Sequence, residues 1–189
     1  IAASLRHLGG LSDLVVGTSA SGRTDSGYFD TIGYFTTVVA HRVRFREEMT
    51  VGELISSVKN TVNGSLEHSE IPIDLVEEAL GMTPGRDHLF EVFIQIHAKN
   101  KLNGTLTGPE GKPVEFRQID PDKHESMLGL QFEVMEETIG GERSIRVLMS
   151  YRSERYGPDD VDRLRSTTSS VFSRFAEAGA SNRMLTTLA

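Results

Sequence analysis

The stretch from residue 17 to residue 37 reads GTSASGRTDSGYFDTIGYFTT and is dense in glycine, serine and threonine. Its glycines are Gly17, Gly22, Gly27 and Gly33. A phosphate-binding loop needs glycines at fixed offsets that open a helix, with lysine before serine or threonine or with the GxGxxG spacing. The glycines here recur too widely, and the run behind them, Tyr34–Val39, has β-type character. The spacing therefore excludes a phosphate cradle and predicts a loop between strands.

Strands are predicted on both sides of this loop. Asp13–Thr18 (DLVVGT) is a short apolar run of β-branched character, which predicts a buried strand. Residues 19–33 form the loop, and Tyr34–Arg44 (YFTTVVAHRVR) predicts a second strand that is long enough to cross a sheet. Farther along the chain, Phe90–Ala98 (FEVFIQIHA) predicts another strand, because it is nearly all apolar on one face.

Helix signals occur at three places after the second strand. Thr50 and Glu53 have the form of a capping box, and apolar residues at helical spacing follow, which predicts a helix over residues 51–67. A shorter helix is expected from Asp74 to Leu80. Pro158 is expected at the first position of the last helix, because proline is favoured there.

The opening segment, IAASLRHLGG, has the pattern of the last turns of an amphipathic helix that ends at Gly9 or Gly10. No capping residue precedes Ile1, so the chain is expected to begin inside an element, as a fragment whose upstream partner is missing. A cloning boundary or a shifted numbering would give the same pattern.

The second half of the chain is rich in strand patterns. Residues 99–113 hold glycines and prolines and predict an exposed loop. Further strands are predicted at Val114–Ile119, Met127–Glu136 and Ser144–Tyr151, and the turn Ile139–Gly141 joins the last two as an antiparallel hairpin. Strands and helices are therefore interspersed. The pattern predicts an α/β fold with a mixed β-sheet flanked by helices and a late antiparallel hairpin.

Composition bounds the class of protein. The 189 residues suggest one domain, or one lobe of a larger domain, and the contents of 38% hydrophobic and 25% charged residues are typical of a soluble globular protein. The apolar runs are too short to span a bilayer, and residues 1–20 lack a basic segment leading into an apolar one, so neither a membrane partner nor a signal peptide is expected. Because the chain has no cysteine, a cytoplasmic setting is the default.

The charge pattern argues against a nucleic acid as partner. The net charge is -7, and phosphate binding needs a concentrated basic face. Arg42, Arg44 and Arg46 alternate along the second strand and offer a local basic stripe. Glu47 and Glu48 follow at once, which favours a solvated strand face over a basic stripe.

Residues alone predict no complete catalytic site. The histidines, which are the candidates for acid–base chemistry, are His7, His41, His68, His88, His97 and His124. None lies within four residues of another, so no paired zinc site is predicted, and a structural role is favoured for each, with His97 the least ordinary. No GxSxG elbow is present, because Ser19 in GTSASG has the wrong spacing.

The order of several segments resembles the C-terminal half of the condensation domain of nonribosomal peptide synthetases. DLVVGTSASGR (13–23) is similar to DxVVGTPVAGR, and TIGYFTTVVAHRV (31–43) to IGxFVNTxxxR. HSEIPIDLVEEAL (68–80) is similar to HQDxPFExLVEAL, and GRDHLFEVFIQI (85–96) to RxxxRNPLFQVxFxxQ. A weaker similarity links SYRSERYGPDDVDRL (150–164) to YxTDLFDxxTxxRL. The resemblance covers nearly all of the chain.

This resemblance implies a chloramphenicol-acetyltransferase-like lobe over residues 1–189 that packs against an N-terminal lobe. In the family, 4'-phosphopantetheine arms of donor and acceptor carrier proteins enter the tunnel between the lobes, and the acceptor amine or hydroxyl attacks the donor thioester. The catalytic motif HHxxxDG belongs to the N-terminal lobe and is not in this sequence. The chain is therefore expected to carry no catalytic residue, to bind no cofactor or metal by itself, and to be inactive alone. Its expected contribution to natural product biosynthesis is the acceptor-side wall, latch and floor of the tunnel.

The resemblance also names tunnel residues. By position, they are Gly17, Thr18, Ser19, Arg23, Gly33, Phe35, Thr36, Thr37 and His97. A pantetheine arm is a thin chain of amides and methylenes, so its channel needs close backbone approach and hydroxyl or amide groups, which loops of glycine, serine and threonine supply. The alternative is that the same residues only build a tight surface loop.

Departures from the family pattern keep other functions open. Thr37 replaces the asparagine of IGxFVN, Thr36 the valine before it, Ser19 the proline of GTPVAGR, and His97 the glutamine of FxxQ. These changes fit unusual substrates, or a catalytically inactive condensation-like platform that recruits a tailoring enzyme. A third hypothesis is an acyltransferase lobe that uses CoA thioesters without carrier proteins.

Overall fold

The computed structural model of the chain describes residues 1–97, 104–117, 119, 126, 128–139 and 142–187. Its helices are α1 (Ala2–Gly9), α2 (Val51–Leu66), α3 (Ile73–Ala79) and α4 (Pro158–Phe175). Its strands are β1 (Asp13–Ser21), β2 (Thr36–Arg44), β3 (Val92–His97), β4 (Gly104–Thr107), β5 (Pro113–Phe116), β6 (Leu130–Ile139) and β7 (Glu142–Tyr151). Short 3-10 turns lie at Ser26–Tyr28, Pro109–Gly111, Ala180–Asn182 and Leu185–Thr187.

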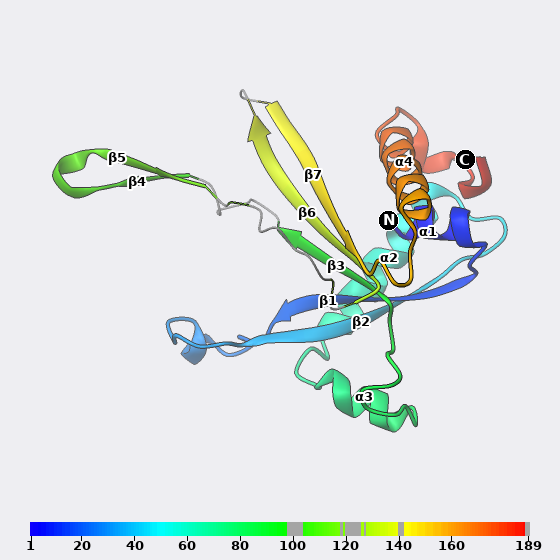
Figure 1. Ribbon diagram of the computed structural model, residues 1–189, viewed down its shortest axis with the longest axis horizontal. Coiled ribbons are helices and arrows are strands. Elements are labelled where there is room, and N and C mark those ends of the chain that lie inside the picture. Colours follow the sequence, from blue (N-terminus) through cyan, green and yellow to red (C-terminus); the bar gives the residue numbers. More distant parts are fainter. Residues whose placement is uncertain (98–103, 118, 120–125, 127, 140–141, 188–189) are drawn as a thin grey trace.

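The main sheet has the strand order β2-β1-β3-β6-β7 (Figure 1). Its centre is parallel, since β1 pairs with β3 and β3 with β6 in parallel, whereas β2 and β7 lie antiparallel at the two edges. The sheet is therefore mixed, and the late hairpin is β6–β7, as the sequence predicts. β4 and β5 form a separate antiparallel ribbon that extends far from the sheet (Figure 1).

The helices α1, α2 and α4 pack on one face of this sheet, where two apolar clusters form. The first joins β2 to α2 and α4, through residues that include Val43, Val51, Leu54 and Val171. The second joins β1, β3 and β6 to α4, through residues that include Val16, Val92, Phe132 and Leu164. Burial of this face accounts for the helical spacing of apolar residues along α2 and α4.

The helix ends follow the predicted local chemistry. Thr50 and Glu53 form the complete capping box that starts α2: the Thr50 hydroxyl accepts from the Glu53 N–H, and the Glu53 carboxylate accepts from the Thr50 N–H. Pro158 begins α4, and α1 ends at Gly9 and is capped by Gly10, whose φ of 62° is in the left-handed region that glycine favours.

Several predicted boundaries need correction. The first strand continues to Ser21, and the second begins only at Thr36, because the backbones of 13–21 and 36–44 pair along their whole length. The predicted loop 99–113 contains β4, which pairs with β5; residues 98–103 lie outside the described residues. The hairpin strand predicted from Met127 begins at Leu130 and ends at Ile139, and residues 127 and 140–141 of that region lie outside the description.

Candidate functional site

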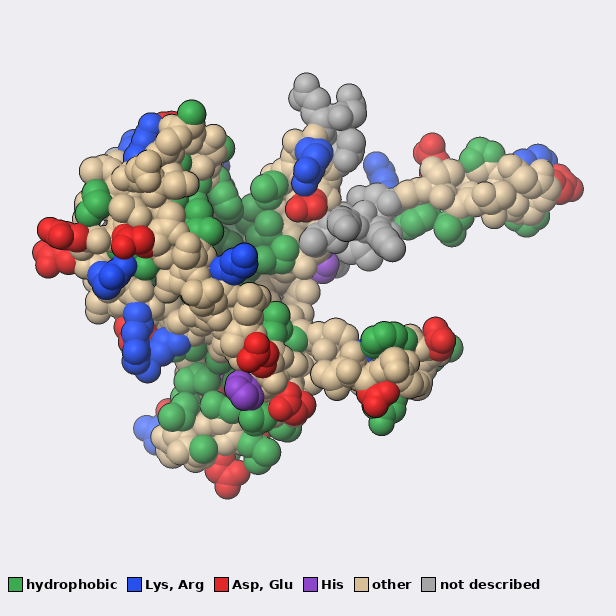
Figure 2. Space-filling view, turned by 180° about the vertical axis from the view of Figure 1, so that it is seen from behind, with side chains coloured by type: hydrophobic (Ala, Val, Ile, Leu, Met, Phe, Trp, Pro, Cys, Tyr) green, Lys and Arg blue, Asp and Glu red, His purple; other side chains and the backbone are tan. Residues whose placement is uncertain are grey.

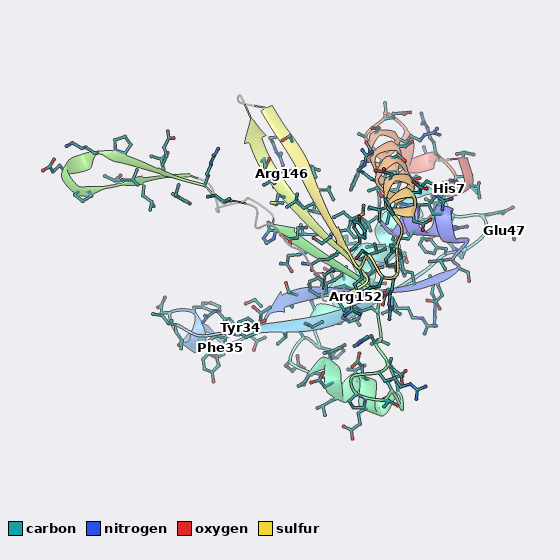
Figure 3. All side chains as sticks on the ribbon, in the orientation of Figure 1. His7, Tyr34, Phe35, Glu47, Arg146 and Arg152 are labelled. Carbon is teal, nitrogen blue, oxygen red and sulfur yellow. The ribbon has the colours of Figure 1, made fainter. Side chains whose placement is uncertain are left out.

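The tip of the β1–β2 hairpin is organised by one arginine. Arg23 donates to the carbonyl oxygens of Tyr28 and Gly33, and its guanidinium lies over the ring of Phe35 at 4.1 Å from the centroid. Planar guanidinium groups suit this double role, since they stack on rings and donate in a fixed fork. These contacts hold the glycine-rich loop together up to Phe35, the residue before β2, and Tyr34 and Phe35 lie near the far end of the β1–β2 hairpin (Figure 3).

A shallow pocket of about 330 Å³ lies at the base of this tip. It is lined by Ser19, Ala20, Ser21, Arg23, Gly33, Tyr34, Phe35, Thr36 and Gln95. The lining combines hydroxyl groups, the Gln95 amide and the Arg23 guanidinium. At Gly33, which has no side chain, the backbone itself is accessible. Such a wall can hydrogen-bond a thin polar chain without obstructing it.

A row of polar side chains continues from this pocket across the sheet. The Ser19 hydroxyl donates to the side-chain oxygen of Gln95, and Gln95 is paired in register with Glu133 on β6. The Gln131 amide donates to the Glu133 carboxylate at 3.3 Å. Because side chains alternate along a strand, this row lies on the face opposite to the helices, whereas Ile94 and Phe132 face the core.

The next row on the same face is more buried and charged. Met135 is fully buried, and Arg146 on β7 lies beside it and donates to the Glu137 carboxylate at 2.8 Å. His97, the last residue of β3, is in register with Met135. Arg146 is labelled between β6 and β7 in Figure 3. The half-buried ion pair between Arg146 and Glu137 links β6 to β7, so it stabilises the edge of the sheet at which the polar face ends.

The structure brings most of the predicted tunnel residues together and separates the others. Ser19, Arg23, Gly33, Phe35 and Thr36 all line the pocket. His97 lies farther along the same face.

Three predicted tunnel residues have other surroundings. Thr18 donates to the carbonyl of Ile94 at 2.6 Å, and the Thr37 hydroxyl is buried without a hydrogen-bond partner among the described residues. At Gly17, an added Cβ would lie 2.3 Å from the ring of Phe90, so this glycine makes room for an aromatic ring of the protein itself.

Sequence reasoning did not find Gln95 or Glu133 as members of the candidate site. Gln95 interrupts the apolar run of β3, and Glu133 alternates with apolar residues on β6. Such alternation shows that one face of a strand is polar, but only the sheet order places these two residues beside Ser19.

The basic stripe considered for β2 is neutralised. The Arg42 guanidinium makes a two-pronged contact with Asp13, and Arg46 pairs with Glu53 at 2.9 Å. Arg42 holds the pKa of the Asp13 carboxyl below its usual value, mainly through this hydrogen bond. The predicted solvated strand face therefore carries ion pairs and not a free cationic surface.

No group of histidines and carboxylates with the spacing of a metal site occurs among the described residues. Nor is any helix within the described ranges long and apolar enough to cross a bilayer. Among the histidines that the structure describes, His41 and not His97 has the least ordinary surroundings, because it is buried in the apolar layer between sheet and helices. Burial lowers its pKa from the usual value of 6.5.

Comparison with protein families decides the identity of this fold. A family model described as the condensation domain matches residues 1–184. The chain belongs to the condensation domain family. The mixed sheet with helices on one face is accordingly the chloramphenicol-acetyltransferase-like lobe that the motifs led us to expect.

Relatives of the condensation domain chain are large synthetases. Gramicidin S synthase 2 of Brevibacillus brevis is 26% identical over 167 residues, which cover 85% of this chain and 3% of the synthase. Surfactin synthase subunit 2 of Bacillus subtilis (strain 168) is 33% identical over 116 residues, which cover 60% of this chain and 3% of that subunit. The chain thus spans only a few per cent of the length of these relatives.

Solved structures share the fold of this condensation domain chain. The X-domain from teicoplanin biosynthesis superposes with a TM-score of 0.74 at 22% identity, over 98% of this chain and 42% of that chain. At 22% identity, the superposition is evidence for a shared fold alone. The chain therefore corresponds to less than half of the X-domain structure.

Proposed function

We propose that this chain is the C-terminal lobe of a condensation domain, and that its polar sheet face forms one wall of the channel in which two carrier-bound substrates are joined. The observation that carries this proposal is the continuity between the pocket at Ser19 and Gly33 and the polar row through Gln95. Helices α1, α2 and α4 pack on one side of the sheet, so the polar side is the one that we expect to face a second lobe. Family membership supports the same assignment.

The reaction that this wall would serve is the transfer of an acyl group from a thioester to an amine or hydroxyl. With an amine, a new C–N bond forms at the thioester carbonyl, the C–S bond breaks, and the proton lost by nitrogen balances the thiolate that leaves. The histidine motif that orients or deprotonates the amine would come from the N-terminal lobe. The residues of this chain would position the two arms and exclude water, which is a contribution through proximity and orientation.

The pocket residues fit a 4'-phosphopantetheine arm presented by a carrier protein. Ser21 and Thr36 offer hydroxyl groups that both donate and accept, and the Gln95 side chain, whose oxygen accepts from Ser19, offers its amide N–H groups. These groups match the amides of the arm, while Gly33 leaves the backbone approachable. Arg23 would act indirectly, because its guanidinium is engaged with the loop carbonyls and Phe35.

The experiment that tests this function uses the intact parent protein with a donor and an acceptor carrier protein, each loaded with its thioester. The expected result is a condensed product on the acceptor carrier, detected by mass spectrometry, which is lost when the second histidine of an upstream HHxxxDG motif is changed to alanine. Product from CoA thioesters without carriers would support a CoA-dependent acyltransferase instead. Stable binding of a tailoring oxidase with no product from any thioester would support a recruiting platform.

A further inference from the structure

The main sheet is split between β1 and β3, although these strands are parallel neighbours. Both strands lie wholly within the described residues, and their register pairs only two residues of each strand, the last being Gly17 with Phe93. β1 continues to Ser21 and β3 to His97, so both strands run on beyond the end of this ladder. Figure 1 shows β1 and β2 diverging from β3, β6 and β7 in the same direction. The sheet therefore opens from Gly17 and Phe93 onward.

Two side chains cross the split where backbone hydrogen bonds would continue a ladder. The Thr18 hydroxyl donates to the Ile94 carbonyl at 2.6 Å, and on the polar face the Ser19 hydroxyl donates to the side-chain oxygen of Gln95. By contrast, β1 pairs with β2 at every residue, and β3 pairs with β6 at every residue of β3. The loss of backbone pairing is therefore confined to the boundary between β1 and β3.

The split leaves backbone groups of both strands outside the ladder. Alternate residues of a paired strand turn their N–H and C=O groups to opposite neighbours. The Gly22 N–H donates toward β2, so Ser19 and Ser21 turn their backbone groups away from β2 and toward β3. The Ile94 carbonyl faces β1, so the N–H and C=O of Ile96 face β1 as well. Donors and acceptors that the described β1–β3 ladder does not use thus line both sides of the split.

The split opens into the pocket at the base of the hairpin tip. Ser19, Ala20 and Ser21 line this pocket from β1, and Gln95 lines it from β3. Exposure rises along β1, from the buried Gly17 to the exposed Ser21. Figure 2 shows the tip of the hairpin projecting from the rest of the lobe. An extended chain can therefore enter the split from the pocket without displacing the apolar core.

We propose that the split binds an extended chain of secondary amides as an additional strand between β1 and β3. This inference rests on the proposed function, which supplies two such chains: the 4'-phosphopantetheine arm and the peptidyl group that the arm carries. An extended chain that pairs with an exposed strand edge gains main-chain hydrogen bonds. In a channel that a second lobe closes, the backbone groups of Ser19, Ser21 and Ile96 need such partners in place of water.

This mode of binding sets a chemical preference. Recognition through main-chain groups tolerates different side chains on the bound chain, because those side chains project to the two faces of the sheet. It requires amide N–H groups on the bound chain, so N-methylated amides are disfavoured. The split therefore selects secondary over tertiary amides and does not select one particular side chain.

Hydrogen exchange of single backbone amides in the intact parent protein tests this proposal. The protein is mixed with a carrier protein in three forms: without the arm, with the arm, and with a dipeptidyl group joined to the arm by a stable amide. The N–H groups of Ser19, Ser21 and Ile96 should exchange about tenfold more slowly when the bound chain is present, because each gains a hydrogen bond. The Ala20 N–H, which faces β2, is the internal control and should not change.

The three carrier forms distinguish the two sources of the chain. Slower exchange with the bare arm identifies the arm, and slower exchange with the dipeptidyl form alone identifies the peptidyl group. Unchanged exchange in every form, or an equal change with the carrier that lacks the arm, would overturn the proposal. Condensed product without any slowing would contradict only this binding mode, whereas slowing without product would contradict only the joining of substrates.

N-methylation of the bound chain supplies a second measurement. A carrier whose arm or dipeptidyl group has N-methylated amides should not slow exchange at the split, and condensation with it should fall about tenfold. Equal rates with the methylated and unmethylated chains would count against main-chain recognition.

A side-chain variant separates backbone from hydroxyl recognition. Ser19→Ala removes the bridge to Gln95 and keeps the N–H of residue 19, so slowing at Ser21 and Ile96 should stay within about twofold of the unsubstituted protein. Ser26→Ala, in the exposed loop outside the pocket lining, is the matched control. Loss of slowing in the Ser19 variant alone would assign recognition to the hydroxyl and overturn the proposal.

Discussion

The guanidinium carbon of Arg23 lies 4.1 Å from the centroid of the Phe35 ring, so that the two ends of the glycine-rich loop are held together at the pocket. The same guanidinium donates to the carbonyl of Gly33 at 3.3 Å. The arginine of the GTSASGR run therefore supports the wall of this pocket, through contacts with a phenylalanine twelve residues farther along the chain.

Arg23→Lys in the intact protein is expected to loosen the hairpin tip and slow condensation about tenfold, because lysine keeps the charge but loses the planar fork and the stacking. The midpoint of thermal unfolding should change little, since the tip is exposed and outside the core. Hydrogen exchange of residues 24–34 and the condensation rate are the measurements. Arg163→Lys on the exposed surface of α4 is the matched control and should leave both unchanged; an unaltered exchange rate in the Arg23 variant would refute the support role.

Gly33→Val in the intact enzyme is expected to block acceptor entry while the protein folds normally. The added Cβ would lie 3.0 Å from the Phe35 ring, so the valine both fills the pocket and presses on its wall. The rate with a loaded acceptor carrier should fall by about two orders of magnitude, as expected when positioning is lost. Gly64→Val on α2 is the control, because an added Cβ there meets no atom within 4 Å. Unchanged condensation by the Gly33 variant would contradict the proposal that this loop forms part of the channel wall.

Gly17→Ala is expected to destabilise the lobe by about 1–3 kcal/mol, the usual cost of overpacking a filled site. The reason is that the new methyl group would overlap the Phe90 ring, whose nearest atom lies 2.3 Å from the ideal Cβ position. Denaturant unfolding measures the change. A second substitution, Phe90→Leu, should restore part of the lost stability in the double variant; additive losses would contradict direct contact between the two positions.

The stability of the lobe is expected to fall as the pH drops below about 6.5, the usual pKa of histidine. Burial lowers the pKa of His41 in the folded state, so the unfolded state binds more protons over this range and is favoured by acid. Lys59 is the other ionisable side chain on the walls of the apolar groove around His41. His41→Leu should flatten the pH dependence of the free energy of unfolding relative to the unsubstituted protein, and an equal slope in both proteins would rule out His41 as its source.

Much of the fold could be predicted from local patterns. The capping box at Thr50, the proline at the start of α4 and the alternation along β6 and β7 each act over a few residues, so the elements follow from neighbours in sequence. The motif order likewise identified the family before any geometry was known. Strand β5 was predicted as residues 114–119, but its partner β4 was not, because β4 is only four residues long, is exposed and lacks a buried face to mark its period.

The membership of the site depended on the tertiary structure. The sequence by itself determined that a glycine-, serine- and threonine-rich loop connects two strands and that Arg23 and Gly33 belong to it. Only the sheet order decided that Gln95 and Glu133 complete the polar face, that Gly17 accommodates Phe90, and that His41 faces an apolar groove. The physical reason is that alternation along a strand separates its two faces, whereas what covers each face is set by strands and helices distant in the chain.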